Sequence, residues 1–314
     1  MNRHKSTVTH FLALALLCFL IWCSPSHSET FPKNSSNGVE TIVFGYTPQI
    51  FYQVDKRDAI ELMDAWARIS ERKLNHSIKI STVMYRTLAD AENAVAKKEV
   101  DLLVMIPEEL LSLRSHADLE SVLSADFGNT VYNNLLLLVR EGSSTQIEQL
   151  RGKSLIIDMG QKGTIPLKWL ESLLKTEGLP NSGLFLGHMT ESSNGSQALM
   201  PVFFGKADAC LVERNHYETS VELNPQIAQR LHILARSPGF VTGIISVRKG
   251  VSKTVRDKVV KVLQEMHTDP RGKQIMTLFR INRLVPFLPE HLTSVKKLLP
   301  PITVKRAIAA QRKQ

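Results

Sequence analysis

Apolar residues in the first part of the chain follow two different spacings. Met63, Trp66 and Ile69 recur at the period of an amphipathic helix. Short apolar or alternating runs flank such helical stretches, as expected of strands, and the run DLLVMI is typical of a buried parallel strand. This β-α-β-α-β order predicts a doubly wound α/β lobe. The expected strands cover residues 40–49, 77–85 and 101–106, and the expected helices cover residues 55–74 and 87–100.

The same alternation begins again near residue 131. Residues 164–179 form an amphipathic pattern with Pro166 in the first turn and Gly178 near the end, both typical of helix boundaries. The expected strands of this second part are 131–143, 153–160, 184–189, 207–213, 230–238 and 241–250. The expected helices are 147–152, 164–179, 252–269 and 270–280, with two more around 196–206 and 216–224.

Two successive α/β sets predict two lobes of similar construction. We expect a discontinuous first lobe made of residues 39–135 and 242–300, and a second lobe made of residues 136–241. The segments Asn133–Arg140 and Val241–Val247 are the expected two-strand hinge. Residues 301–314 follow Pro300 and Pro301 and are expected to form a basic tail.

The N-terminus has the pattern of a secretory signal peptide. Arg3 and Lys5 precede an apolar run from Phe11 to Trp22, and Ser26 and Ser28 supply small residues for cleavage before Glu29. An uncleaved anchor is the alternative, but an apolar run this short falls well below the ~20 residues that span a bilayer. We expect residues 1–28 to be a cleaved signal peptide and the protein to be exported to the periplasm.

Cysteine content and charge limit the remaining possibilities. Of the three cysteines, Cys18 and Cys23 lie in the signal region, so the exported chain would keep only Cys210 and form no internal disulfide. Lys and Arg number 39 against 30 Asp and Glu, a formal net charge of +9. That balance is compatible with an anionic ligand, an anionic membrane or nucleic acid, and does not choose among them.

Signatures of enzymes and metal sites are missing from the sequence. The Gly152-Lys153-Ser154 triplet lacks the glycine that a phosphate-binding loop needs five positions earlier, where Ile147 stands. No Gly-x-Ser-x-Gly elbow or His-Glu-x-x-His pair occurs, and the histidines are scattered. Basic residues are not interleaved with aromatic ones, which disfavours nucleic-acid binding. We expect no catalytic residue, metal or cofactor.

Three stretches carry a resemblance to a known family. The run from Tyr132 to Gly160, the stretch ALMPVFFGKADACLVERNHYE with LHILARSPGF, and the stretch YRTLADAENAVAKKEVDLLVMIPEEL resemble periplasmic solute-binding proteins. The similarity is to the phosphate/phosphite/phosphonate-type substrate-binding proteins of ABC transporters, in the type 2 periplasmic binding protein superfamily. It implies an α/β fold of two doubly wound lobes joined by a two-strand hinge, with a ligand cleft between them. It also implies a monomer that delivers a small, phosphate- or phosphonate-like anion to a membrane permease.

The resemblance places the anion at the start of the second-lobe helix that begins near residue 164. Family members have a turn rich in serine and threonine there, whereas this chain has Gln161, Lys162, Gly163 and Thr164. A helix N-terminus offers unpaired N–H groups and a partial positive charge, and Lys162 would add a full charge. The alternative is that Thr164 is a plain N-cap and Lys162 is solvated.

Five further residues are candidates for the cleft. Tyr46 follows the first strand, Tyr85 begins the second helix, and Glu108 follows DLLVMI at the carboxyl end of a strand, where α/β proteins bind ligands. Asn194 precedes another helix, in a region where the family has a histidine that this chain replaces with Gln197. Glu213 ends the strand ADACLVE, where an acidic residue in family members can pair with a ligand amine. Packing or solvated surface is the alternative for each.

Two other functions use the same fold. An exported sensor would use the cleft to signal to a membrane kinase. An enzyme would need a nucleophile or an acid–base pair in the cleft, and the sequence indicates neither.

Overall fold

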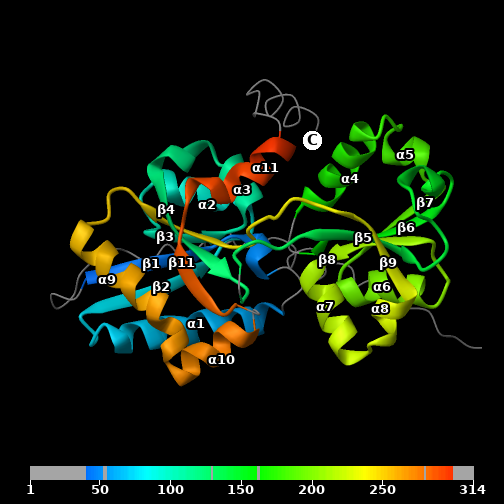
Figure 1. The fold of residues 1–314 in the computed structure, drawn as a ribbon. Helices are drawn as coiled ribbons and strands as arrows, with labels where there is room; N and C mark the ends of the chain where they lie inside the picture. Colours follow the sequence, from blue (N-terminus) through cyan, green and yellow to red (C-terminus); the bar gives the residue numbers. More distant parts are fainter. Residues whose placement is uncertain (1–39, 52–54, 129, 161–162, 279–280, 300–314) are drawn as a thin grey trace, which may run out of the picture. The chain divides into compact units, whose positions relative to one another are not determined.

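The computed structural model describes residues 40–51, 55–128, 130–160, 163–278 and 281–299. The predicted signal peptide (1–28), the basic tail (301–314) and Lys162 lie outside these residues. The described chain contains two β-sheets with helices packed on them (Figure 1). None of its helices is long and apolar enough to cross a membrane.

The first sheet has the strand order β11-β4-β10-β3-β1-β2. β1 pairs in parallel with β2 and β3, while β10 runs antiparallel to both β3 and β4. Thus a strand that comes late in the sequence is inserted at the centre of a sheet built mainly from the first hundred described residues. Its strands are β1 (Glu40–Tyr46), β2 (Ile78–Met84), β3 (Leu102–Met105), β4 (Leu119–Asp126), β10 (Ile244–Arg248) and β11 (Arg283–Pro286).

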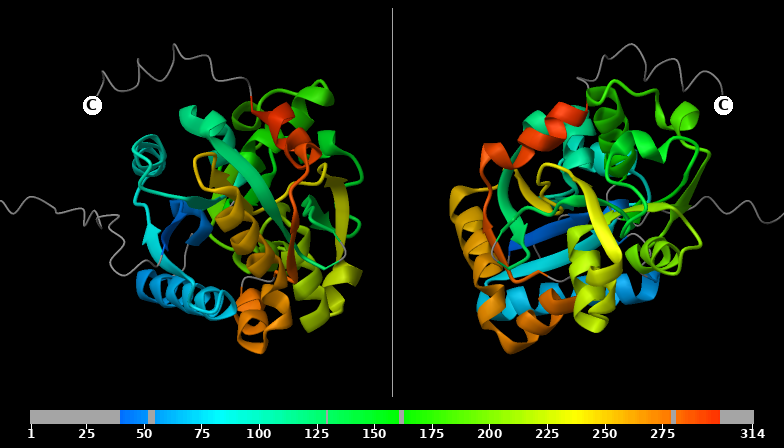
Figure 2. Two further views of the ribbon diagram at one scale, coloured as in Figure 1. Left: turned by 90° about the vertical axis from the view of Figure 1, so that its left-hand side faces the viewer. Right: turned by 45° about the vertical axis from the view of Figure 1, so that its right-hand side comes forward.

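Helices cover both faces of this sheet. α1, α9 and α10 share one hydrophobic cluster with alternate residues of the strands, and α2 and α3 share another with the remaining strand residues. Figures 1 and 2 show α1, α9 and α10 on one side of the sheet and α2 and α3 on the other. The helices are η1 (Pro48–Phe51), α1 (Lys56–Lys73), α2 (Leu88–Ala96), α3 (Pro107–Ser112), η2 (Arg114–Asp118), α9 (Lys253–Gln264), η5 (Glu265–Thr268), α10 (Pro270–Leu278), η6 (Pro289–Leu292) and α11 (Thr293–Leu298).

The second sheet has the order β7-β6-β8-β5-β9. β6 pairs in parallel with β7 and β8, and β5 runs antiparallel to β8 and β9. Its strands are β5 (Leu135–Arg140), β6 (Ser154–Asp158), β7 (His188–Ser192), β8 (Ala209–Glu213) and β9 (Leu231–Arg236). Its helices are η3 (Ile147–Leu150), α4 (Ile165–Thr176), α5 (Ser182–Phe185), α6 (Gly195–Phe203), α7 (Arg214–Leu223) and α8 (Gln226–Arg230).

Two chain segments connect the sheets, residues 127–134 and 237–243. They meet at one bridge, where the backbone N–H groups of Asn133 and Phe240 each donate to the other's carbonyl at 2.8 Å. The expected hinge strands differ from this arrangement. Residues 135–140 and 244–248, which were part of the expected hinge, are inner strands of the two sheets, and their apolar side chains are buried.

The end of the expected first lobe, residues 242–300, also contacts the second sheet. Val295 of α11 is buried in the hydrophobic cluster of that sheet, and α11 packs against α4 as well as against α3. Residues 184–189 were expected to be a strand. Asn181 instead caps the short helix α5 by accepting the Leu184 N–H, so the strand begins only at His188.

Candidate functional site

A cavity of about 1130 Å³ lies where the carboxyl ends of parallel strands from both sheets meet. Tyr46 ends β1, Glu108 follows β3, Asn194 follows β7 and Glu213 ends β8, and all four line the cavity. This position follows from the α/β topology, which gathers residues beyond the carboxyl ends of strands into a common crevice. Four of the sequence-predicted site residues are therefore brought together.

Glu108 and Thr164 form the most specific contact at this site. Thr164 donates both its backbone N–H and its hydroxyl to the Glu108 carboxylate, the former over 2.8 Å to Oε2. The Lys168 ammonium, one turn into α4, lies 3.1 Å from Glu108 Oε1. A carboxylate from the end of β3 thus sits at the N-terminus of α4, where three donors surround it.

Local sequence explains how these groups reach each other. Pro107 stands in the first turn of α3, so Glu108 projects at the start of that helix. Gly163 has φ of +58° and lies so close that a Cβ at this position would collide with Glu108 Oε2. The alternative role for Thr164, a plain N-cap, is not what the structure shows: its side chain makes no capping hydrogen bond to α4 and instead binds Glu108.

The neighbouring Glu109 fixes the start of α3 from the other side. Its Oε2 accepts the Thr47 hydroxyl at 2.5 Å and the Ile106 N–H at 3.3 Å, which ties the end of β1 to the end of β3. Burial raises the pKa of the Glu109 carboxyl, and hydrogen bonds from Thr47 and from the backbone of Ile106 and Gln49 partly offset this rise. Sequence analysis did not single out Glu109, which differs from Glu108 in facing the interior.

A second polar cluster lies at the carboxyl ends of β6 and β8. Asp158 is only 2% exposed; its Oδ2 lies 2.9 Å from His216 Nδ1, and its buried Oδ1 has no hydrogen-bond partner in the described part of the chain. Glu213 accepts a hydrogen bond from the Asn133 side chain. Gly160, with φ of +38°, lies beside Asp158 and Glu213. This cluster is suited to hydrogen-bond donors or a positive charge on a solute.

The other predicted residues have structural surroundings of their own. Asn194 caps α6 by accepting the Gln197 N–H at 2.9 Å, so its side-chain oxygen is already engaged. Tyr85 is not among the residues that line the cavity: it packs on the opposite face of the first sheet, with its ring against Gly45. It precedes the N-cap of α2, Thr87, by two residues and so does not begin that helix. Burial raises the pKa of both Tyr46 and Tyr85.

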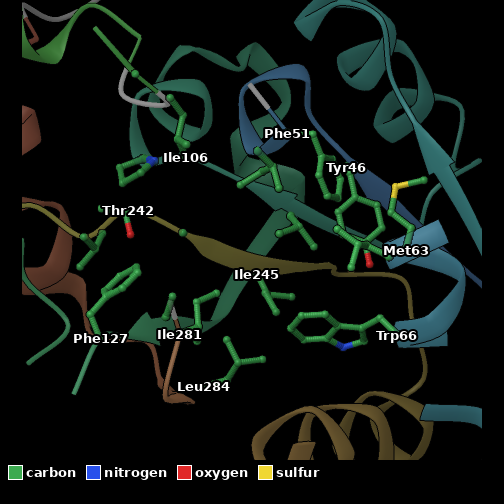
Figure 3. A pocket seen from close by; sticks show the side chains of 18 of the residues that line it. Tyr46, Phe51, Met63, Trp66, Ile106, Phe127, Thr242, Ile245, Ile281 and Leu284 are labelled. Carbon is green, nitrogen blue, oxygen red and sulfur yellow. The ribbon is translucent and has the colours of Figure 1, made fainter. Parts of the chain in front are cut away.

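Most of the cavity wall is apolar, and of this part the sequence indicated only Tyr46 as a site residue. Apart from Thr242, the side chains labelled in Figure 3 are large and mainly apolar. They come from β1, α1, β10 and β11, from the segments after β1, β3 and β4, and from the residues just before β11. Their helical and strand periodicities are those of ordinary core residues, so no sequence signal separates them from filled core. Among these side chains are Tyr46, Phe51, Met63, Trp66, Ile106, Phe127, Ile245, Ile281 and Leu284.

No metal centre is evident in the part of the chain that the structure describes, since no three His, Cys, Asp or Glu side chains are arranged to hold an ion. The residues that line the cavity offer hydrogen bonds, charge and apolar contact to a ligand. Cys210 is buried in β8, and burial raises the pKa of its thiol. A buried, protonated thiol is unreactive.

Solved structures share this fold. XAC2383 from Xanthomonas citri, bound to chloride ion, matches with a TM-score of 0.61 at 16% identity, over 86% of this chain and 99% of that one. A binding protein component of the ABC phosphonate transporter of Pseudomonas aeruginosa matches with a TM-score of 0.57 at 14% identity, over 82% and 85%. PhnD1 from Prochlorococcus marinus, in complex with methylphosphonate, matches with a TM-score of 0.58 at 13% identity, over 82% and 96%.

No curated protein sequence matches the chain. The model of a protein family does match, over residues 46–292. This range includes every strand of both sheets except residues 40–45 of β1. The resemblance stated from sequence and the α/β fold are thereby confirmed, and the family is one of solute-binding proteins rather than enzymes. The chain belongs to the family of periplasmic substrate-binding proteins of phosphonate ABC transporters.

Proposed function

We propose that this protein captures a small anionic solute of the phosphate or phosphonate type in its cavity and delivers it to the permease of an ABC transporter. The observation that supports this most directly is the carboxylate of Glu108 at the N-terminus of α4. An oxyanion occupies that position and receives the Thr164 N–H, the Thr164 hydroxyl and the Lys168 ammonium. A phosphonate also presents anionic oxygens, which accept hydrogen bonds from donors of this kind.

In this proposal the solute exchanges with Glu108. The absence of a side chain at Gly163 leaves room for an oxyanion to approach the backbone of the helix start. Lys162, which lies outside the described residues, would add a second positive charge. The solute's hydrogen-bond donors would face Asp158 and Glu213, and Asn194 would contribute through the backbone it fixes at the start of α6.

The two connecting segments suit a binding protein that opens and closes. They are short and meet at the Asn133–Phe240 bridge, so a rotation about them would change the access to the cavity. Residues from both sheets line the cavity, so a solute would contact both. Export through cleavage of residues 1–28, and action as a monomer, are parts of the same proposal.

Calorimetric titration with phosphate, phosphite and methylphosphonate tests the anion site. In the Glu108→Ala background, Thr164→Val removes a hydroxyl donor that no internal carboxylate then occupies. A hydrogen bond to a charged group contributes roughly 1.5–3 kcal/mol, so we expect Kd to rise about ten- to a hundredfold relative to Glu108→Ala. Glu108→Ala removes the internal competitor and is expected to lower Kd. Thr176→Val, at the other end of α4 with its hydroxyl on the Ser172 carbonyl, is the matched control and should leave Kd unchanged. Binding of only neutral or cationic solutes, or an unchanged Kd when Thr164→Val is added to Glu108→Ala, would contradict the proposal.

A further inference from the structure

The cavity is much larger than the anion site at its edge requires. We call the part bounded by Phe44, Trp66, Phe127, Ile245, Ile281 and Leu284 the apolar chamber. It lies on the side of the first sheet that α1 covers, with Phe44 on β1. Figure 3 shows Ile245 of β10, Leu284 of β11 and Trp66 of α1 around it. Tyr46, Ile106 and Thr242 belong to the same cavity, which also reaches Glu108 and Ile165 of the first turn of α4. Thr164 and Lys168 are not among its lining residues, so the chamber is connected to the anion site through the Glu108 carboxylate that these two residues hold.

Volume argues against a small hydrophilic ligand as the only occupant. The whole cavity has about 1130 Å³. Sites of roughly 300–1,000 Å³ hold drug-sized ligands, and a water molecule takes about 30 Å³ in the liquid. A phosphate or methylphosphonate held by Thr164 and Lys168 would therefore leave most of this space unfilled.

Chemistry of the wall argues for an apolar occupant. A buried water needs two to four polar partners, and the six side chains that bound the chamber are aliphatic or aromatic. An empty apolar cavity lowers stability in proportion to its volume, so a ligand group that fills it gains dispersion contacts as well as hydrophobic free energy. Trp66, which is only partly buried, would be covered by such a group.

We propose that the solute carries an apolar substituent, an alkyl chain or an aromatic ring, which enters the apolar chamber while its charged group binds at the start of α4. The inference rests on the proposed function for the position of the charged group. It deepens that function by naming the ligand class as an organic anion with a hydrophobic side group rather than a bare oxyanion.

A chain-length series tests the inference. Alkylphosphonic acids from methyl to octyl, and matched 1-alkanols without the charge, are titrated into the protein. If the chain enters the chamber, Kd falls about fourfold for each added methylene until the chamber is full. Trp66 reports on the chamber: Trp169→Phe leaves it as the sole tryptophan after residue 28, and its fluorescence should change with long chains and not with methylphosphonate.

Filling variants show where the chain binds. Ala125→Leu puts a larger side chain into the cavity from β4, and Ala65→Leu does so from α1 as a second variant in case the first fails to fold. Either should abolish the gain in affinity with chain length and leave the Kd of methylphosphonate unchanged. Ala94→Leu is the matched control, because it adds the same side chain to α2 on the opposite face of the sheet and should preserve the chain-length dependence.

The outcomes separate the two proposals. If phosphonates bind with a Kd that does not depend on chain length, the inference of an apolar chamber is wrong and the proposed function still holds. If the affinity for alkanols rises with chain length while no phosphonate binds, the apolar chamber is supported and the proposed anion site is wrong. The apolar chamber is also wrong if Kd does not depend on chain length in either series. It is equally wrong if the dependence on chain length persists in Ala125→Leu and Ala65→Leu.

Discussion

The two sheets have the same plan and different interiors. In each, one inner strand runs antiparallel to both of its neighbours, β10 in the first sheet and β5 in the second. The first sheet adds an edge strand, β11, which is antiparallel to β4. Residues 135–139 of β5 are fully buried on both faces, whereas Ile245 of β10 borders the large cavity. Trp169 of α4 is 4% exposed in a closed core, and Trp66 of α1 is partly exposed at the cavity wall. Strand order therefore does not determine how completely a core is filled.

Truncation of a central strand residue should reveal this difference most strongly. Leu137→Ala removes a fully buried side chain from the second sheet, and we expect the free energy of unfolding to fall by about 3–5 kcal/mol. Ile245→Ala, beside the cavity, removes a side chain that already lacks neighbours on one side, so we expect a loss nearer ~2 kcal/mol. Urea denaturation of both variants measures the two losses. Equal losses would mean that the two cores are equally filled in solution.

Enlargement of a small residue tests the same contrast in the opposite direction. Ala209→Leu in β8 forces extra volume into a filled core and should lower the free energy of unfolding by about 1–3 kcal/mol. The side chain of Ala125→Leu in β4 can expand into the cavity. We therefore expect the free energy of unfolding to fall by less than about 1 kcal/mol, or to rise. Both positions are nearly fully buried alanines in sheet strands, so each variant controls for the other. A large loss at Ala125 would argue against the apolar chamber.

The α/β plan of the fold could be predicted from the sequence. The elements that the prediction missed were missed for physical reasons. Strands such as β3 and β5 are continuous apolar runs, which periodicity detects. β4 was missed because Ser121, Ser124 and Asp126 interrupt its apolar pattern. Their partners are remote: Ser121 and Ser124 lie against Ser246 and His291, and Asp126 accepts from Arg283. Such contacts exist only once distant segments have come together.

Candidate residues could be named from the sequence, but their arrangement could not. Glu108 and Thr164 were each named, Glu108 from its place after a strand and Thr164 from its place before a helix. Their contact joins residues 56 positions apart, and nothing in the local pattern of either one indicates it. The apolar chamber was missed for a different reason, since Trp66 and Ile245 have the spacing of core residues whether or not the space beside them is filled.

Acidic groups of the two halves should respond to pH with opposite signs. In the first half, burial raises the pKa of Glu109, so the folded protein holds that proton more tightly than the unfolded chain does. Stability relative to Glu109→Gln, which does not titrate, should therefore fall as pH rises from about 4, the unfolded value, through the folded pKa. The free energy of unfolding of both proteins between pH 4 and pH 8 measures this difference. A constant difference across the range would show that Glu109 is not destabilised by burial.

The smallest effect is expected at the exposed end of the second sheet. Asp208 accepts the Ser154 hydroxyl at 2.6 Å and the Ser154 N–H at 2.9 Å, and chiefly these donors lower its pKa, with Lys153 adding a weaker contribution. The stabilisation is present above the unfolded pKa of about 3.9 and is lost as pH falls through the folded pKa. The side chain is 44% exposed, so solvent screens the charge, and Asp208→Asn should cost less than about 1 kcal/mol at pH 7. The difference in the free energy of unfolding between wild type and Asp208→Asn should shrink on acidification, because protonation removes the favourable interactions of the Asp208 carboxylate. Acidification has the opposite effect at Glu109, where protonation removes an unfavourable buried charge and so raises stability. A difference for Asp208→Asn that grows toward low pH would contradict the assignment of Ser154 as the group that favours the charged carboxylate.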